Sequence, residues 1–177
     1  MFHNKSPRPV LTLPRSGPEV ALEALAAVGL IASFAIVLMY WSQLPERIPT
    51  HFGFSGQPDA WGSPMTLWMM PGISAALYAM LTVVSLFPHK FNYLHTITEA
   101  NAEGHYRLAR GLLLWIKVLI MVLFAWLTWQ ICAIALERST QLNKLFLPLL
   151  LGGIMLTLMV YLVRATKVES SAASGEM

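Results

Sequence analysis

The sequence predicts an all-α integral membrane protein with four transmembrane helices and an ordered loop outside the cytoplasm. The 177-residue chain is 56% hydrophobic and only 12% charged, with a mean hydropathy of +0.58. Soluble domains carry roughly 25% charged residues. Four apolar stretches approach the roughly 20 residues that a helix needs to cross a bilayer. The loop between the first two is rich in proline, glycine and aromatic residues, unlike a disordered linker.

The predicted membrane domain covers residues 20–163 and contains the four spans. These are residues 20–42, 65–87, 112–136 and 145–163. In the first span, Ala26, Gly29 and Ser33 follow one another at helical spacing. Either they let another helix approach closely, or they reflect chance in an alanine-rich segment. In the second span, Pro71 either kinks the helix or lies in its first turn.

Polar segments flank and separate these spans. The tail at 1–19 lacks the apolar core of a signal peptide, and we expect it to be mobile, at least at its tip. The 88–110 connection is polar, with Asn101 as a candidate cap of the third helix and Glu103 in its first turn. Thr96 with Glu99 also fits a capping box. Residues 164–177 form a Ser/Ala tail without anchoring features.

Lysine and arginine counts orient the helices across the membrane. The 1–19 tail carries three, the 88–110 loop three and the 164–177 tail two, against one in the 44–63 loop and two in residues 137–145. We therefore expect both termini in the cytoplasm and the 44–63 loop outside.

Residues 44–63, which we call the cap, have the chemistry of a rigid turn. Pro45 and Pro49 fix φ and remove backbone donors, so no helix runs through the segment. Gly56 allows a positive φ, and Pro58-Asp59 is a turn signal. We expect the cap to be ordered and to pack on the membrane surface.

The cap holds one polar pair of interest. His51 and Asp59, eight residues apart across the turn, could meet and hydrogen-bond. A zinc site needs three or four ligands, so we prefer a turn staple, in which Asp59 orients the imidazole, to half of a metal or proton site. His89, His95 and His105 match no metal motif, and we expect them to cluster by chance.

Lys117 is the one charge that lies within an apolar stretch. An intramembrane charge is costly and is a functional candidate by default. Because Lys117 lies about two helical turns past Arg110, its stem could snorkel to the cytoplasmic interface. It could instead pair with Glu99, Glu103 or Glu23. We prefer either arrangement to a role in transport.

The cap sequence LPxxIPxHFxxxGxPDxW resembles the signature of domain of unknown function 1648, a family of small bacterial membrane proteins. The same domain occurs at the front of SdpI-type immunity proteins. The matching positions are Leu44, Pro45, Ile48, Pro49, His51, Phe52, Gly56, Pro58, Asp59 and Trp61.

A second run resembles the next signature of the four-span members of that family. Its positions are Phe91, Asn92, Tyr93, Ile97, Thr98, Asn101, Ala102, Glu103, Tyr106 and Arg107. One departure is Leu94, which stands where proline would follow Asn-Tyr. The two runs place the resemblance over roughly residues 44–136.

The resemblance implies a multi-pass protein of the bacterial cytoplasmic membrane, and it leaves the biochemical role open. We consider a protein whose cap binds or senses a peptide or protein partner, an accessory subunit of a larger membrane complex, and a transporter that would have to oligomerise.

No nucleophile elbow, phosphate loop or HExxH motif occurs. The basic residues form no patch suited to nucleic acid. We expect no enzymatic activity and no cofactor; the expected partners are the lipid bilayer and a membrane protein or peptide, with a homo-oligomer also open.

Overall fold

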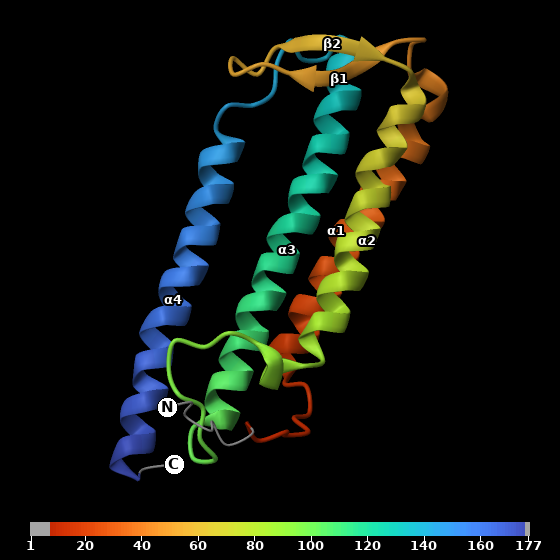
Figure 1. Cartoon of the computed structure of the whole chain (residues 1–177). Helices are drawn as coiled ribbons and strands as arrows, with labels where there is room; N and C mark the ends of the chain where they lie inside the picture. The colour runs from red at the N-terminus through yellow and green to blue at the C-terminus, as the bar shows by residue number, and fades with distance from the viewer. Residues whose placement is uncertain (1–7, 176–177) are drawn as a thin grey trace, which may run out of the picture.

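A computed structural model describes residues 8–175 (Figure 1). Within this range, four helices are long and apolar enough to cross a membrane: α1 (Gly17–Tyr40), α2 (Met69–Ser85), α3 (Ala102–Ala135) and α4 (Phe146–Ser174). A two-stranded sheet of β1 (Ile48–Phe52) and β2 (Pro58–Gly62) lies across one end of the bundle. Three short 3₁₀ helices complete this part of the chain: η1 (Trp41–Gln43), η2 (Pro64–Trp68) and η3 (Pro88–Lys90). The four-helix prediction is confirmed, whereas the all-α prediction is wrong because the cap folds as a hairpin.

The hairpin forms because its prolines exclude a helix but are tolerated in edge strands. The strands pair antiparallel, with Pro49 opposite Trp61 and Phe52 opposite Pro58, and the register shifts on both sides of His51. Both strands of a two-stranded sheet are edges, so a proline without an N–H leaves no central ladder bond unmade. Gly56 closes the hairpin loop with a φ of +81°, which favours glycine.

Helices α3 and α4 each extend about ten residues beyond a predicted span. The third begins at Ala102, where predicted Glu103 does lie in its first turn, and the fourth continues to Ser174. Bilayer thickness sets the minimum length of a spanning helix but does not determine the residue at which the helix ends. The predicted C-terminal tail is therefore helical through Ser174. Val168 there packs so closely on Gly104 that an added Cβ would lie 2.7 Å from its Cγ1.

Helices α1 and α3 run parallel, while α2 and α4 run in the opposite direction (Figure 1). The small residues of α1 pack against α3: a Cβ on Gly29 would lie 2.9 Å from Met121 Cβ, and the hydroxyls of Ser33 and Thr128 are 3.2 Å apart. Of the two interpretations of this small face, close helix approach is confirmed. Of the two interpretations of Pro71, a place in the first turn is confirmed, because α2 begins at Met69.

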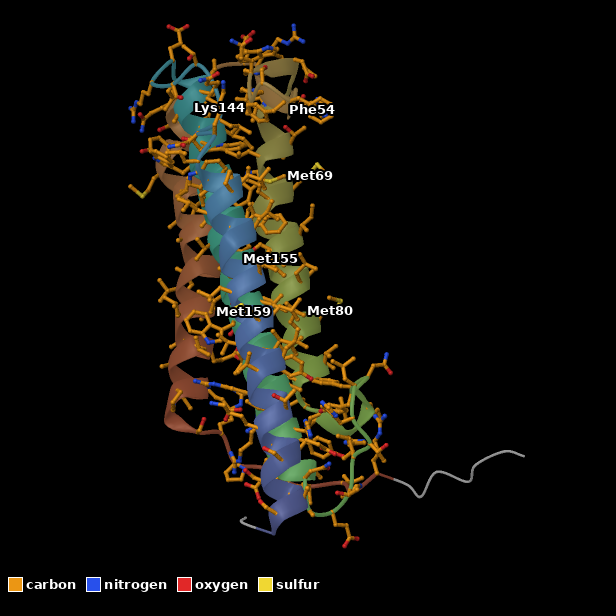
Figure 2. The ribbon with its side chains drawn as sticks, turned by 90° about the vertical axis from the view of Figure 1, so that its left-hand side faces the viewer. Phe54, Met69, Met80, Lys144, Met155 and Met159 are labelled. Atoms are coloured by element: carbon orange, nitrogen blue, oxygen red, sulfur yellow. The ribbon has the colours of Figure 1, made fainter. Side chains whose placement is uncertain are left out.

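Helix α4 is the least buried element of the bundle. Its only buried residue is Ala165, and it packs mainly on α3. Met155 and Met159 lie on its outer face, both about 60% exposed (Figure 2). Such a helix has one protein neighbour and a wide apolar surface, as expected for a helix surrounded by lipid.

An apolar cluster fastens the cap to the helices. Its buried members are Val37, Ile48, Leu67, Ile131, Cys132 and Ala135. Because Ile48 comes from β1 and the others come from η2, α1 and α3, the cluster orders the hairpin relative to the bundle.

Candidate functional site

The cap lies at the end of the bundle away from the start of α1 (Figure 1). The candidate cap residues divide by burial into anchors and a surface. Ile48 and Pro49 are buried, and Phe52, Gly56 and Pro58 are half-buried. The exposed set is Pro45, His51, Asp59 and Trp61. The structure thus places these nine residues in or beside one hairpin, and only the last four present their side chains outward.

His51 and Asp59 form the predicted pair. Their Nδ1 and Oδ1 atoms are 2.6 Å apart, and the side chains are 71% and 50% exposed. Across the same hairpin, Arg47 donates to the Trp61 carbonyl at 3.0 Å. Because an exposed pair is screened by water, we expect it to contribute only about 0.2–1 kcal/mol. Within residues 8–175, no three His, Cys, Asp or Glu side chains are arranged to hold a metal ion.

Phe54 is the cap residue that sequence reasoning left out of the candidate set. It lies at the hairpin tip and its side chain is fully exposed (Figure 2). The tip itself is tied down, since the Leu142 N–H donates to the Gly56 carbonyl at 2.8 Å. The hairpin therefore presents an aromatic ring from a fixed backbone.

At the opposite end, a buried ion pair joins α1 to α3. The Arg110 guanidinium donates hydrogen bonds to both carboxylate oxygens of Glu19, at 2.5 and 2.9 Å. Both residues are more than nine-tenths buried. Arg110 also donates to the Leu13 and Pro14 carbonyls at 3.0 and 3.1 Å. Glu19 in turn accepts from the Ser16 N–H at 2.7 Å, which fixes the start of α1.

These contacts order a segment that the sequence predicted to be mobile. Arg8 donates to the Phe91 carbonyl at 2.6 Å, and the Tyr106 hydroxyl donates to the Pro9 carbonyl at 2.8 Å. Arg107 bridges Glu103 and the Pro14 carbonyl, at 2.9 and 3.3 Å. Residues 8–16 are thus held against α3, while the predicted mobile tip lies outside the described residues.

A second buried ion pair lies one turn further along α1. The Lys117 ammonium donates to Glu23 at 2.5 Å and to the Thr82 hydroxyl at 2.6 Å, and it lies 3.8 Å from the centre of the Tyr78 ring. The Tyr78 hydroxyl donates to the same Glu23 oxygen at 2.6 Å. Of the arrangements weighed for Lys117, pairing with Glu23 is confirmed. Snorkelling is wrong, because the lysine is only 1% exposed and is held by α1 and α2.

A third polar cluster joins α3 to the far end of α4. The Asn101 amide donates to Glu169 at 3.0 Å and to the Thr96 carbonyl at 3.0 Å, and its oxygen accepts from the Thr98 N–H at 2.8 Å. His105 Nε2 lies 3.3 Å from the same Glu169 oxygen. Asn101 is therefore at the N-cap position of α3, but its side chain ties the preceding loop to α4 and caps nothing.

The remaining loop residues surround this cluster. Tyr93 donates to the Pro88 carbonyl at 2.9 Å, and burial raises the pKa of its phenol, so the hydroxyl stays protonated as a donor. Asn92 is exposed. The Thr96–Glu99 capping box is absent from the described chain because α3 begins only at Ala102.

Sequence reasoning missed Glu19 and Arg110 as site residues and mentioned Glu23 only as one possible partner. A signal was present. Glu19 and Glu23 are one helical turn apart, and Arg110 and Lys117 are two turns apart, so each set lies on one face. Two acidic residues on one face of α1 and two basic residues on one face of the parallel helix α3 can form two ion pairs between these helices.

One comparison with known proteins falls on the cap and its flanking helices. The model of DUF1648, a domain of unknown function, matches residues 28–75, from the middle of α1 through the cap to the start of α2. An uncharacterised protein of Archaeoglobus fulgidus is 33% identical over 82 residues, which cover 46% of this chain and 42% of that protein. The chain therefore matches less than half the length of this relative. No solved structure matches the chain. The resemblance drawn from the cap sequence is confirmed, because the DUF1648 model matches the cap within residues 28–75.

Proposed function

We propose that this protein is a non-enzymatic component of the bacterial cytoplasmic membrane whose cap binds a peptide or protein partner outside the cytoplasm, as an immunity protein would. Four apolar helices and the DUF1648 match support a membrane protein. The distribution of lysine and arginine supports cytoplasmic termini and an outward cap.

The observation that carries this proposal is the exposed ring of Phe54 on an ordered hairpin. Buried Ile48 and the hydrogen bond from Leu142 to Gly56 hold the hairpin in place. A partner that covers Phe54 gains the burial of a large apolar side chain without having to order a flexible loop. Aromatic anchors of this kind carry much of the energy of protein interfaces.

The test is site-specific photo-crosslinking in intact cells. A benzophenone side chain at Phe54 should form a discrete crosslink to one peptide or protein, and the same group at Leu94 is the control. Leu94 is 76% exposed but lies in the loop that begins after α2, away from the cap. Crosslinks to phospholipid alone would instead mean that Phe54 dips into the bilayer, and the binding proposal would be abandoned.

A second readout separates immunity from simple binding. A strain that lacks the protein should become sensitive to the crosslinked peptide, and Phe54→Ser should restore resistance less well than the wild-type chain. Equal resistance with Phe54→Ser would remove the ring from the proposed site.

The alternative is a small accessory subunit packed against a larger membrane complex. Helix α2 favours it, because Gly72, Ala76 and Ala79 lie exposed on its surface and an added Cβ on Gly72 would meet nothing within 4 Å. Small residues at such spacings let a foreign helix approach closely. A stoichiometric membrane partner that is lost on Ala76→Leu, with Phe54 dispensable, would favour this function.

A further inference from the structure

A cleft opens between the first turns of α1, the adjoining half of α3, and α4. Its volume is about 620 Å³, within the range of small-molecule sites. It exists because α4 packs mainly on α3 and leaves the side toward α1 uncovered. Its lining changes from charged to apolar along the helices.

The apolar part of the cleft is long. Its walls include Leu112, Trp115, Leu119, Leu156 and Val160. Along α3 the lining runs from Arg107 to Leu119, which corresponds to about 18 Å of helix. On α4 it runs from Arg164 to Gly153, about 16 Å. Half of a bilayer's hydrocarbon core is about 15 Å thick, so the cleft has the length of one leaflet.

The charged part of the cleft is positive. Three charged residues line it: Glu19, Arg107 and Arg164. The bidentate ion pair with Arg110 neutralises Glu19, and Arg107 is paired with Glu103. Arg164 is exposed and makes no hydrogen bond or ion pair with any residue of the range 8–175. The end of the cleft therefore holds one unpaired guanidinium beside an apolar channel.

We propose that this cleft binds one anionic phospholipid from the surrounding leaflet. The phosphate lies on Arg164, because a guanidinium matches phosphate oxygens in geometry and charge. One acyl chain lies along the apolar wall beside Trp115. A helix from a second copy of the chain would fill the apolar part but would leave Arg164 without an anion. The proposal is independent of the cap.

The chain offers matched controls for both halves of the cleft. Lys167 lies one turn beyond Arg164 on the same helix and does not line the cleft. Gly111 lines the cleft with nothing within 4 Å of an added Cβ, whereas Gly152 has equal room outside the lining.

The test is native mass spectrometry of the full chain released from detergent with added dioleoyl phosphatidylglycerol or dioleoyl phosphatidylcholine. We expect one phosphatidylglycerol molecule per chain to be retained preferentially. Arg164→Gln should weaken its binding about five- to tenfold, the loss of one basic contact, while Lys167→Gln should change it less than twofold. Arg164→Lys should have an effect between these two, because it keeps the charge but loses the geometry of the guanidinium. Gly111→Leu should abolish retention, and Gly152→Leu should leave it unchanged.

Three results would overturn the proposal. The first is equal retention of the two lipids, and the second is an equal effect of Arg164→Gln and Lys167→Gln. The third is a dimer that forms without bound lipid and that Gly111→Leu disrupts. Because Arg164 is exposed, its variants do not depend on a buried contact for folding, and the outcome stands even if Gly111→Leu fails to fold.

Discussion

Lys117 and Glu23 are 94 positions apart in the chain, and their side chains meet inside the helical bundle at 2.5 Å. The pair lies between α1 and α3, and Thr82 and Tyr78 bring in α2. Lys117, on α3, therefore contacts α1 and α2, and it links the three helices that carry the cap. Since an unpaired charge in a bilayer is costly, this contact selects one relative rotation of α1 and α3.

A first prediction concerns Gly29, where α1 approaches α3 most closely. Gly29→Ala should destabilise the protein by about 1–3 kcal/mol, because the new methyl group would lie 2.9 Å from Met121 Cβ and would push the helices apart. Gly152→Ala is the control, since nothing lies within 4 Å there and helix propensity should stabilise it by up to about 1 kcal/mol. The measurement is the melting temperature of each variant in detergent. Equal shifts in the two variants would show that the close approach is not limiting.

The sequence predicted the apolar helices because hydropathy and bilayer thickness are properties of a segment by itself. It also predicted that His51 and Asp59 could meet, since a short turn brings its two ends together. The strands were not predicted, because Pro49 and Pro58 argue against a strand unless that strand lies at the edge of a sheet. Whether a strand is an edge depends on tertiary structure.

The ion pairs needed more than segment properties. Which glutamate meets Lys117 depends on the rotation of α1 about its axis and on its registry with α3. Likewise, the contacts of Glu169 with Asn101 and His105 depend on how α4 packs against α3. Neither hydropathy nor a charge count gives the rotation or registry of packed helices, so the candidate set missed Glu19, Arg110 and Glu169.

A second prediction concerns membrane orientation. In a Cys132→Ala background, single cysteines at Ser55 and Glu99, both exposed, should react differently with an impermeant thiol reagent in intact cells. The cysteine at Ser55 should label directly and the one at Glu99 only after permeabilisation, because the basic segments favour the cytoplasmic side. Direct labelling of both positions would contradict the orientation.

A third prediction concerns the His51–Asp59 pair. His51→Ala and Asp59→Ala should each lower stability by no more than about 1 kcal/mol, because both side chains are largely exposed. The double variant should show a coupling energy of a few tenths of a kcal/mol that falls at high salt. Melting temperatures with and without chelator should coincide. Metal that stays bound through purification and disappears in both variants would replace the staple with a metal site.

The last prediction concerns the Lys117–Glu23 pair. Glu23→Gln should strand the buried ammonium of Lys117 and destabilise the protein by about 3–5 kcal/mol, the usual cost of removing one partner of a buried pair. Lys117→Met should cost less, because the Glu23 carboxylate keeps the Tyr78 hydroxyl as a donor and lies 4.0 Å from the Arg15 guanidinium. The double variant Glu23→Gln/Lys117→Met removes both charges, keeps the length of the Glu23 side chain and most of that of Lys117, and leaves the Tyr78 hydroxyl an amide to bond with. It should therefore recover most of the loss.

The measurement is a double-mutant cycle of unfolding in detergent, with a proton-flux assay of the same variants in liposomes. Full additivity of the two single losses would show that the pair is not coupled. Proton flux through the wild-type protein that the double variant loses at near-native stability would assign the pair to transport rather than to helix registry.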